Sequence, residues 1–522
     1  MATSPLALPK SVKLTPGVLA IIDVVAAARH GARVSIDKSA RGAMLRSRAL
    51  VESRLADGLP YYGINTGFGS LANKRIADAD LQQLQLNLIR SHSAGVGEPL
   101  RTEIVRGMML LLAASLCRGL SGVRPVIAER LVVMLNSGIT PLVPSVGSVG
   151  ASGDLAPLAA IALTLVGEGM VSVAGKTMPT SRALAAIRKQ PIVLHAKEGL
   201  ALINGTHLMA AEGALLGHDA VVLHASAVMG LAMSIDACRA TDTFLDARLY
   251  HARCHTHAGA VAASASAFLA GSTILTSHAE NDPRVQDPYS LRAGPTVLGA
   301  AAASIEYSLT QIAAELGAVT DNPLVISKGR HGEDENAFVS RDDAIVSGAN
   351  FHGMPLAIPL DTLAIALCHV AGISERRSYL MTGAFEPESR IKPFLAPQPG
   401  LQSGLMIAQY TAAACCNELI GLAAPASVAN ISTCAGMEDY NSFGPRSAAK
   451  LRRGVALCRS VLAIEMLIAS QAIAGHRPLK SGVGVEYALG LIGEVVAPLT
   501  EDRPLSGDIA AIEELIALGE LA

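Results

Sequence analysis

The feature that most constrains the fold is a pair of apolar stripes in the second half of the chain. Within residues 356–370, large apolar side chains recur at steps of 4, 3, 4 and 3 residues. Within residues 451–466, they recur at steps of 4, 3, 4 and 4. This spacing lines up one apolar face along a helix. We therefore expect a mainly α fold in which long helices pack into a bundle.

The first half of the chain is less regular. We expect two regions: residues 1–200, an irregular N-terminal region that carries the functional loops, and residues 201–522, the long-helix bundle. Residues 18–40 read as one helix and a turn, and residues 41–55 as a second helix. Residues 170–179 contain the run Val-Ser-Val-Ala-Gly-Lys-Thr, which predicts a small hairpin.

Charge and hydropathy exclude several classes of partner. The chain has 522 residues, of which 50% are hydrophobic and 16% charged, and its net charge is −2. It lacks the basic balance typical of proteins that bind nucleic acid or acidic membranes. The most apolar stretch, residues 208–234, is interrupted by Glu212, His218, Asp219 and His224, which favours a buried helix over a membrane span. So few charges also favour a homo-oligomer, because obligate interfaces resemble a protein core.

The cysteines and histidines give no sign of a metal or a disulfide framework. The eight cysteines are scattered and form no C-x-x-C pair, which is typical of free thiols in a reducing cytosol. Residues 1–16 lack the layout of a signal peptide, so we expect a cytoplasmic protein. His251 and His255 form an H-x₃-H pair, but no further zinc pattern accompanies it. We interpret that segment as a polar turn and expect no metal.

A glycine-rich stretch, Gly147-Ser-Val-Gly-Ala-Ser-Gly-Asp-Leu-Ala-Pro-Leu158, carries the most specific chemistry. It does not match a phosphate loop, a dinucleotide fingerprint or the elbow of a serine hydrolase. Its Ala151-Ser152-Gly153 triplet can cyclise. The Gly153 nitrogen attacks the Ala151 carbonyl, and loss of water from the ring and from Ser152 leaves an exocyclic methylidene. The triplet supplies the small residue, the β-hydroxyl and the unhindered nitrogen that this electrophile needs.

Other separated motifs accompany this loop: Tyr62-Gly-Ile-Asn-Thr-Gly-Phe-Gly69, Ala201-Leu-Ile-Asn-Gly-Thr206, Gln286-Asp-Pro-Tyr-Ser-Leu-Arg292 and Asn350-Phe-His-Gly353. Together with the glycine-rich loop, they resemble the ammonia-lyases and aminomutases that carry a 4-methylidene-imidazole-5-one (MIO) group. Histidine, phenylalanine and tyrosine ammonia-lyases belong to this family. The matches extend from about residue 60 to residue 445 and are closest to the histidine ammonia-lyases.

The resemblance implies a role for each catalytic position. Tyr62, on a mobile loop, would act as a general base with a lowered pKa. Asn204 would hydrogen-bond the oxygen of the imidazolone ring and stabilise developing charge. Phe351 would pack against the electrophile. Tyr289 would lie near the electrophile and orient or protonate the substrate.

Substrate-binding roles are implied in the same way. Arg292 would clamp the substrate carboxylate through its planar fork, and Gln286 would bond polar groups of the substrate. His92 lies in a Ser-His pair similar to that of histidine lyases, and Glu438 matches a glutamate of the same enzymes. An imidazole has one donor and one acceptor nitrogen, so a histidine and a carboxylate could bind both.

These motifs favour the conversion of L-histidine to urocanate, as in histidine catabolism, and leave other substrates and reactions open. The run Tyr440-Asn-Ser-Phe443 reads more like phenylalanine lyases, so tyrosine or phenylalanine remains open as substrate, as does a 2,3-aminomutase. A different class is a non-catalytic helical scaffold in which Ser152 stays unmodified. The resemblance further implies a homotetramer whose active sites combine loops of three subunits.

Overall fold

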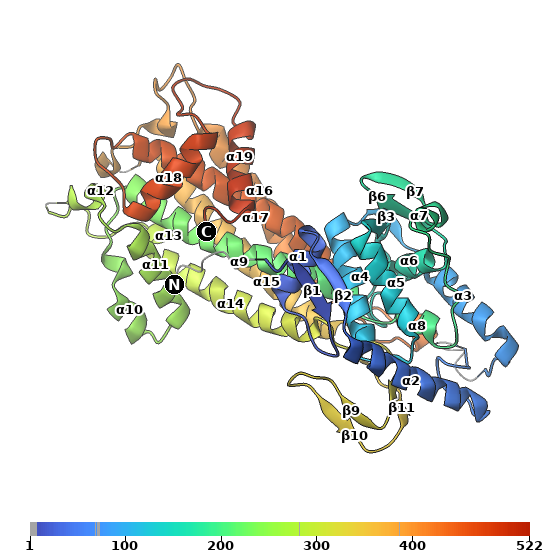
Figure 1. Ribbon diagram of the computed structural model, residues 1–522. Helices are drawn as coiled ribbons and strands as arrows, with labels where there is room; N and C mark the ends of the chain where they lie inside the picture. The colour runs from blue at the N-terminus through green and yellow to red at the C-terminus, as the bar shows by residue number, and fades with distance from the viewer. Residues whose placement is uncertain (1–7, 68, 70–73, 281, 386) are drawn as a thin grey trace.

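The computed structural model describes residues 8–67, 69, 74–280, 282–385 and 387–522. The chain is elongated, with most N-terminal elements at one end and the C-terminal helices at the other (Figure 1). Long helices run between the two ends and join them. The mainly α class expected from the apolar stripes is confirmed.

Short helices and strands build the N-terminal part. Their bounds are β1 (Ser11–Leu14), α1 (Ile21–Arg29), β2 (Arg33–Ile36), α2 (Lys38–Ala56), α3 (Leu81–His92), β3 (Val96–Pro99), α4 (Thr102–Cys117), α5 (Pro125–Asn136), β4 (Ile139–Pro141), β5 (Pro144–Val146), α6 (Leu155–Leu165), β6 (Met170–Val173), β7 (Lys176–Pro179), α7 (Thr180–Ala186) and α8 (Glu198–Ile203). Strands β6 and β7 form the predicted hairpin, and β4 extends it to three strands.

One sequence prediction in this part is wrong. Residues 18–40 are not one helix, because α1 ends at Arg29 and residues 33–36 form strand β2. This strand pairs in parallel with β1 and buries Val34 on its inner side. Local periodicity cannot reveal such a strand, because its partner is a separate segment of the chain.

The second part consists mainly of long helices. These are α9 (His207–Ala237), α14 (Gly294–Glu315), α15 (Met354–Gly383), α16 (Met406–Ala423) and α17 (Gly444–Ala474). Shorter elements are α10 (Ala247–Ala252), α11 (Thr256–Phe268), α12 (Thr273–Thr276), α13 (Tyr289–Arg292), β8 (Leu324–Ile326), β9 (Gly329–His331), β10 (Phe338–Ser340), β11 (Ala344–Val346), α18 (Val483–Val495) and α19 (Ser506–Ala517). Single 3₁₀ turns are η2 (Asp78–Asp80), η3 (Thr243–Leu245), η4 (Pro387–Ser389), η5 (Pro393–Leu395) and η6 (Cys434–Gly436).

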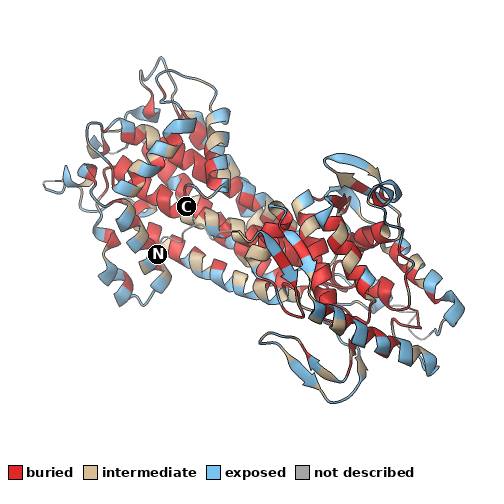
Figure 2. Cartoon of the chain, in the orientation of Figure 1, coloured by how far each residue is buried: buried red, intermediate tan, exposed pale blue. Residues whose placement is uncertain are grey.

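Helices α9, α15 and α17 form the centre of the bundle and pack against one another. Each is long and apolar enough to cross a membrane by length and composition alone. In their most apolar windows, 78%, 61% and 72% of the residues are buried within the chain. Figure 2 shows this buried interior continuing into the N-terminal elements, whereas the β9–β10 hairpin is largely exposed. The division at residue 200 stays a prediction.

The glycine-rich loop connects β5 to α6, and residues 204–206 connect α8 to α9. The two connections lie side by side, with Gly153 bridged to Gly205 in parallel fashion. The N-termini of α6 and α9 therefore meet at the Ala151-Ser152-Gly153 triplet. Helix N-termini carry partial positive charge, so this junction favours negative charge that develops on a bound group.

Candidate active site

A cavity of about 640 Å³ opens directly over the triplet. Its walls come from the loop after α2, the end of α3, the start of α6, helix α8 with the residue after it, and the two segments that precede α15 and α17. The sequence-predicted residues that line it are Tyr62, His92, Ala151, Ser152, Asn204, Phe351 and Glu438. Gly153 lies directly behind them, buried against Gly205.

The backbone at Gly153 admits no side chain. Its φ is +74°, a left-handed conformation that disfavours other residues. A Cβ built there would lie 2.2 Å from the carbonyl oxygen of Gly205. The Asp154 amide nitrogen donates to that same oxygen at 2.7 Å. The glycine is thus required both by its conformation and by the close approach of the 204–206 connection.

Main-chain hydrogen bonds tie the loop to the segments that precede the bundle helices. The Gly353 nitrogen donates to the Gly150 oxygen at 3.0 Å, and the Ser442 hydroxyl donates to the same oxygen at 3.1 Å. The Phe443 nitrogen donates to the Val149 oxygen at 2.9 Å. These contacts explain why residues so distant in sequence form one site.

Asn204 lies where the cyclised triplet would need a donor. Its Nδ2 donates to the Ser152 main-chain oxygen at 2.9 Å. Ring closure between Gly153 nitrogen and Ala151 carbon would make this oxygen the imidazolone oxygen. The residues present therefore fit the MIO group, because the donor and the close-packed glycine are both in place before any ring is formed.

The Ser152 hydroxyl faces Glu438. It donates to Glu438 Oε1 at 2.7 Å, and Thr433 donates to the other carboxylate oxygen at 3.0 Å. Glu438 is half-buried at the wall of the cavity. A carboxylate is therefore fixed within reach of any group bound above the triplet.

His92 presents an acceptor nitrogen in its neutral form. Its Nδ1 lies 2.9 Å from the Leu88 carbonyl oxygen, which can only accept, so this nitrogen carries the proton. Nε2 of the neutral ring is then unprotonated. The ring lines the cavity together with Glu438. One pocket thus offers an acceptor nitrogen and an acceptor carboxylate.

Tyr62 lies in the cavity, but its predicted lowered pKa is not observed. Burial raises the pKa of its phenol above the ordinary value, and the nearby Cys434 and Glu438 raise it further. The hydroxyl accepts a long hydrogen bond of 3.5 Å from the Gly69 nitrogen. No cation contributes to this pKa shift within the described chain. Phe68, in the same motif, lies outside the described residues.

Sequence reasoning missed the function of Asp154. This carboxyl is fully buried, and burial raises its pKa to about 7. Its Oδ2 accepts from the Leu208 and Met209 nitrogens at 2.9 and 3.2 Å, and the Ser148 hydroxyl donates to Oδ1 at 3.0 Å. The side chain therefore caps helix α9 from the residue next to Gly153. The available sequence signal was an acidic residue just before an apolar helix. That signal predicts a cap for α6, whereas the side chain caps α9.

His207, the first residue of α9, is also buried, and burial lowers its pKa to about 4. Among the described residues neither ring nitrogen has a hydrogen-bond partner. A Cβ on Gly205 would lie 2.4 Å from its Cε1, so the ring packs on the glycine that supports the triplet. The neutral ring acts here as a packing group.

Three predicted residues lie elsewhere in the single chain. Gln286 is exposed before α13, Tyr289 is 73% exposed, and the Arg292 guanidinium lies 4.5 Å from the centre of the Tyr289 ring. Figure 1 places α13 at the opposite end of the molecule from α6 and α8. These side chains therefore do not reach the cavity of their own chain.

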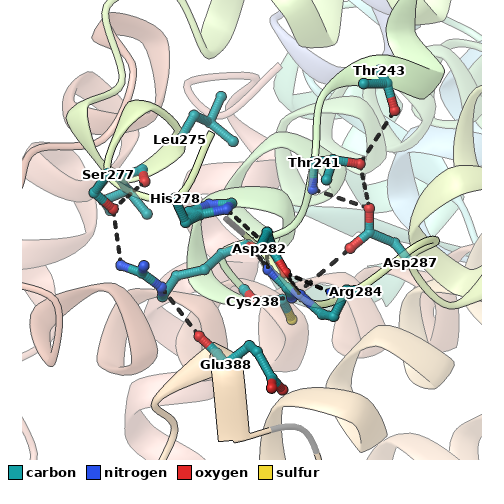
Figure 3. A network of polar contacts seen from close by, with 12 residues as sticks. Cys238, Thr241, Thr243, Leu275, Ser277, His278, Asp282, Arg284, Asp287 and Glu388 are labelled. Atoms are coloured by element: carbon teal, nitrogen blue, oxygen red, sulfur yellow. Dashed lines mark hydrogen bonds and ion pairs between the residues drawn. The ribbon is translucent and has the colours of Figure 1, made fainter. Parts of the chain in front are cut away.

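Polar contacts hold this segment in place. Asp287 is buried and accepts from the Thr241 nitrogen and hydroxyl at 3.0 and 2.6 Å (Figure 3). Nearby, Arg284 pairs with Asp282 at 2.7 Å. The segment that presents Gln286, Tyr289 and Arg292 is thus anchored to the end of the bundle.

The rest of the described chain shows no group of three or more His, Cys, Asp or Glu residues placed to hold a metal ion. The eight cysteines are free thiols. The groups in the cavity that can take part in a reaction are therefore its polar side chains and the triplet.

Comparison with known proteins gives a consistent result. The sequence profile of the family described as aromatic amino acid lyase matches residues 19–494. The histidine ammonia-lyase of Koribacter versatilis is 44% identical over 514 residues, which cover 98% of this chain and 99% of that protein.

Solved structures are similar over the same length. Histidine ammonia-lyase from Trypanosoma cruzi matches with a TM-score of 0.88 and 36% identity, covering 98% of this chain and 94% of that one. Tyrosine aminomutase from Streptomyces globisporus matches with a TM-score of 0.88 and 32% identity, covering 98% and 97%. The full-length match and the cavity over the triplet lead to one conclusion: the chain belongs to the aromatic amino acid lyase family and is a carbon–nitrogen lyase of the ammonia-lyase class.

Proposed function

We propose that the protein eliminates ammonia from L-histidine to give urocanate, with an MIO group formed from Ala151, Ser152 and Gly153. The observation that carries the proposal is that His92 and Glu438 both line the cavity above Ser152. The 44% identity to histidine ammonia-lyases supports it independently.

The MIO group would supply an electrophile that makes the amino group a better leaving group. The chain's own residues do the rest. Asn204 Nδ2, which donates to the Ser152 main-chain oxygen, would hold the ring oxygen, and the N-termini of α6 and α9 would favour negative charge there.

Glu438 and His92 orient the imidazole side chain. The Glu438 carboxylate accepts from one ring N–H. His92 Nε2 accepts from the second N–H when the substrate ring is an imidazolium, whereas a protonated His92 donates to the bare nitrogen of a neutral ring. A phenyl ring would leave both groups unpaired, at a cost of roughly 1–3 kcal/mol each.

Tyr62 is proposed to remove the β-proton. Burial, with the nearby Cys434 and Glu438, raises the pKa of its phenol, so a cation must approach for it to ionise near neutral pH. The substrate ammonium and Arg292 are both suitable cations. We therefore infer that the base becomes competent only in the assembled, substrate-bound site.

Arg292 would come from another subunit of a homotetramer. The α13 segment is anchored, its Tyr289 is exposed, and the buried Arg292 Nε has no hydrogen-bond partner among the described residues. A guanidinium held in this way is prepared to bind a carboxylate that its own chain does not provide. Tyr289 and Gln286 would enter the same neighbouring site.

We further propose that α9, α15 and α17 are the interior of a soluble, cytoplasmic assembly. Buried ion pairs cross them, including Arg377 with Glu465, and such charged groups are costly in lipid.

Intact mass and a substrate panel test the proposal. The mature protein should be lighter than its sequence by two waters per chain. Histidine should give the ultraviolet absorbance of urocanate with a higher kcat/KM than tyrosine or phenylalanine. Full calculated mass in active protein would exclude the MIO group, and full mass with no turnover would favour a non-catalytic scaffold.

A second candidate is a tyrosine or phenylalanine lyase, or a 2,3-aminomutase. The run Tyr440-Asn-Ser-Phe443 favours it, and the resemblance to tyrosine aminomutase makes it concrete. A higher kcat/KM for tyrosine, or formation of a β-amino acid detected by mass spectrometry, would identify that activity.

A further inference from the structure

His352 lies between two residues of the site and has no role in the proposed elimination. Phe351 lines the cavity before it, and the Gly353 nitrogen after it bonds the electrophile loop at Gly150. The His352 ring also lines the cavity, stacked on the Tyr440 ring with centroids 6.3 Å apart and planes at 26°.

The two ring nitrogens of His352 bond main-chain atoms that define its tautomer. The Met354 N–H can only donate, and it reaches Nδ1 at 3.3 Å, so Nδ1 is bare. The Tyr440 carbonyl oxygen can only accept, and it lies 3.0 Å from Nε2, so Nε2 carries the proton. His352 is therefore a neutral bridge between the start of α15 and residue 440.

This bridge holds the segment that carries Glu438. Within that segment, Asn441 nitrogen bonds Asn430, and Thr433 bonds Glu438. These bonds order the segment internally but do not fix its distance from the triplet. The Ser152–Glu438 hydrogen bond spans that distance at present.

Maturation would remove that link, because the Ser152 hydroxyl is lost when the MIO group forms. Ser442 and Phe443 would still tie the C-terminal end of the segment to the loop. Nearer to Glu438, the His352–Tyr440 bond then remains as a tie to the rest of the site.

We propose that His352 is a positioning residue for substrate selection: its Nε2–H holds the Tyr440 main chain and so keeps the Glu438 carboxylate at the imidazole-binding wall. This inference rests on the proposed function. It assigns His352 no contact with the reacting atoms.

Two substitutions separate the two nitrogens. The amide of His352→Asn occupies the place of Nδ1 and can still accept from Met354. The longer His352→Gln can place an N–H where Nε2 was and still donate to Tyr440. We expect His352→Asn to raise the KM for histidine about three- to tenfold, the effect of one lost hydrogen bond, with a much smaller change in kcat. His352→Gln should restore a KM close to that of the wild type.

A double-mutant cycle with Glu438→Gln shows whether His352 acts through the carboxylate. In the Glu438→Gln background, His352→Asn should add little to the KM, since the group it positions is gone. Intact mass and thermal unfolding of every variant report maturation and folding separately from substrate binding.

Equal KM values for the two His352 variants would overturn the inference, as would full additivity in the cycle. Loss of maturation in both variants would also overturn it, because His352 would then act on the electrophile loop through Gly353. Failure of the proposed function is visible beforehand, in wild-type protein with full mass and no turnover.

Discussion

The bundle centre and the floor of the cavity both bury ionisable side chains, but they do so in opposite ways. In the bundle, Arg377 and Glu465 are fully buried and pair, with Arg377 Nη2 2.9 Å from Glu465 Oε2. Ser234 and Ser374 donate to the same carboxylate at 2.7 and 2.5 Å. The charges there are compensated within the chain.

Beneath the triplet, Asp154 and His207 are buried without an ion-pair partner among the described residues. Burial disfavours charge, so it raises the pKa of Asp154 to about 7 and lowers the pKa of His207 to about 4. Both shifts favour the neutral form. Such perturbed groups cluster at functional sites. At these two places the contrast is clear: the Arg377–Glu465 charges compensate each other, whereas Asp154 and His207 lack a counter-charge within the described part of the chain and burial favours their neutral forms.

The largest expected effect comes from Ser152→Ala. It removes the hydroxyl that must leave, so turnover of histidine should fall by at least about a thousandfold, as for loss of a catalytic nucleophile. Its intact mass should show no loss of two waters. Circular dichroism should be unchanged, and a variant that keeps most of its rate would contradict the mechanism.

Breaking the bundle pair should be the largest effect on stability. Glu465→Gln leaves the Arg377 guanidinium buried without its counter-charge, which costs about 3–5 kcal/mol. Thermal unfolding at matched protein concentration measures the loss. The double variant Arg377→Met with Glu465→Gln should recover much of it, and no recovery would mean that packing, not charge, is the main contribution.

Glu438→Gln should lower kcat/KM for histidine by roughly 5- to 150-fold, equivalent to about 1–3 kcal/mol for an unmet polar partner. Tyrosine use should change much less, since a phenol ring has no nitrogen for the Glu438 carboxylate to bond. Steady-state kinetics on both substrates decide this, and equal losses would remove the imidazole argument.

The last prediction concerns pH. In the unfolded chain, His207 becomes protonated as the pH falls below its ordinary pKa of 6.5. In the folded chain it becomes protonated only near its lowered pKa of about 4. Folding stability should therefore decrease as pH falls from 6.5 to 4. His207→Gln removes this contribution, so its unfolding temperature should depend less on pH in that window. Identical slopes for the two proteins would show that His207 is not buried neutral.

Much of the site could be predicted because its chemistry needs rare residue combinations. The Ala-Ser-Gly triplet and the asparagine before Gly205 indicated both the electrophile and its donor, and the structure brings Asn204 to the Ser152 oxygen. The two apolar stripes lie within long helices as predicted, in α15 (Met354–Gly383) and α17 (Gly444–Ala474). Strand β2 was missed because its partner β1 lies in a separate segment.

The sequence by itself determined the helical class and the chemistry of the loop, since both depend on local spacing and on residue type. Only the tertiary structure decided which groups are neutral, because pKa values depend on burial, as at Asp154, His207 and Tyr62. It also decided that His92 and Glu438 share one cavity, while α13, which carries Arg292, lies at the opposite end of the molecule. Distances across packed helices follow from how the whole chain folds, and no local pattern contains them.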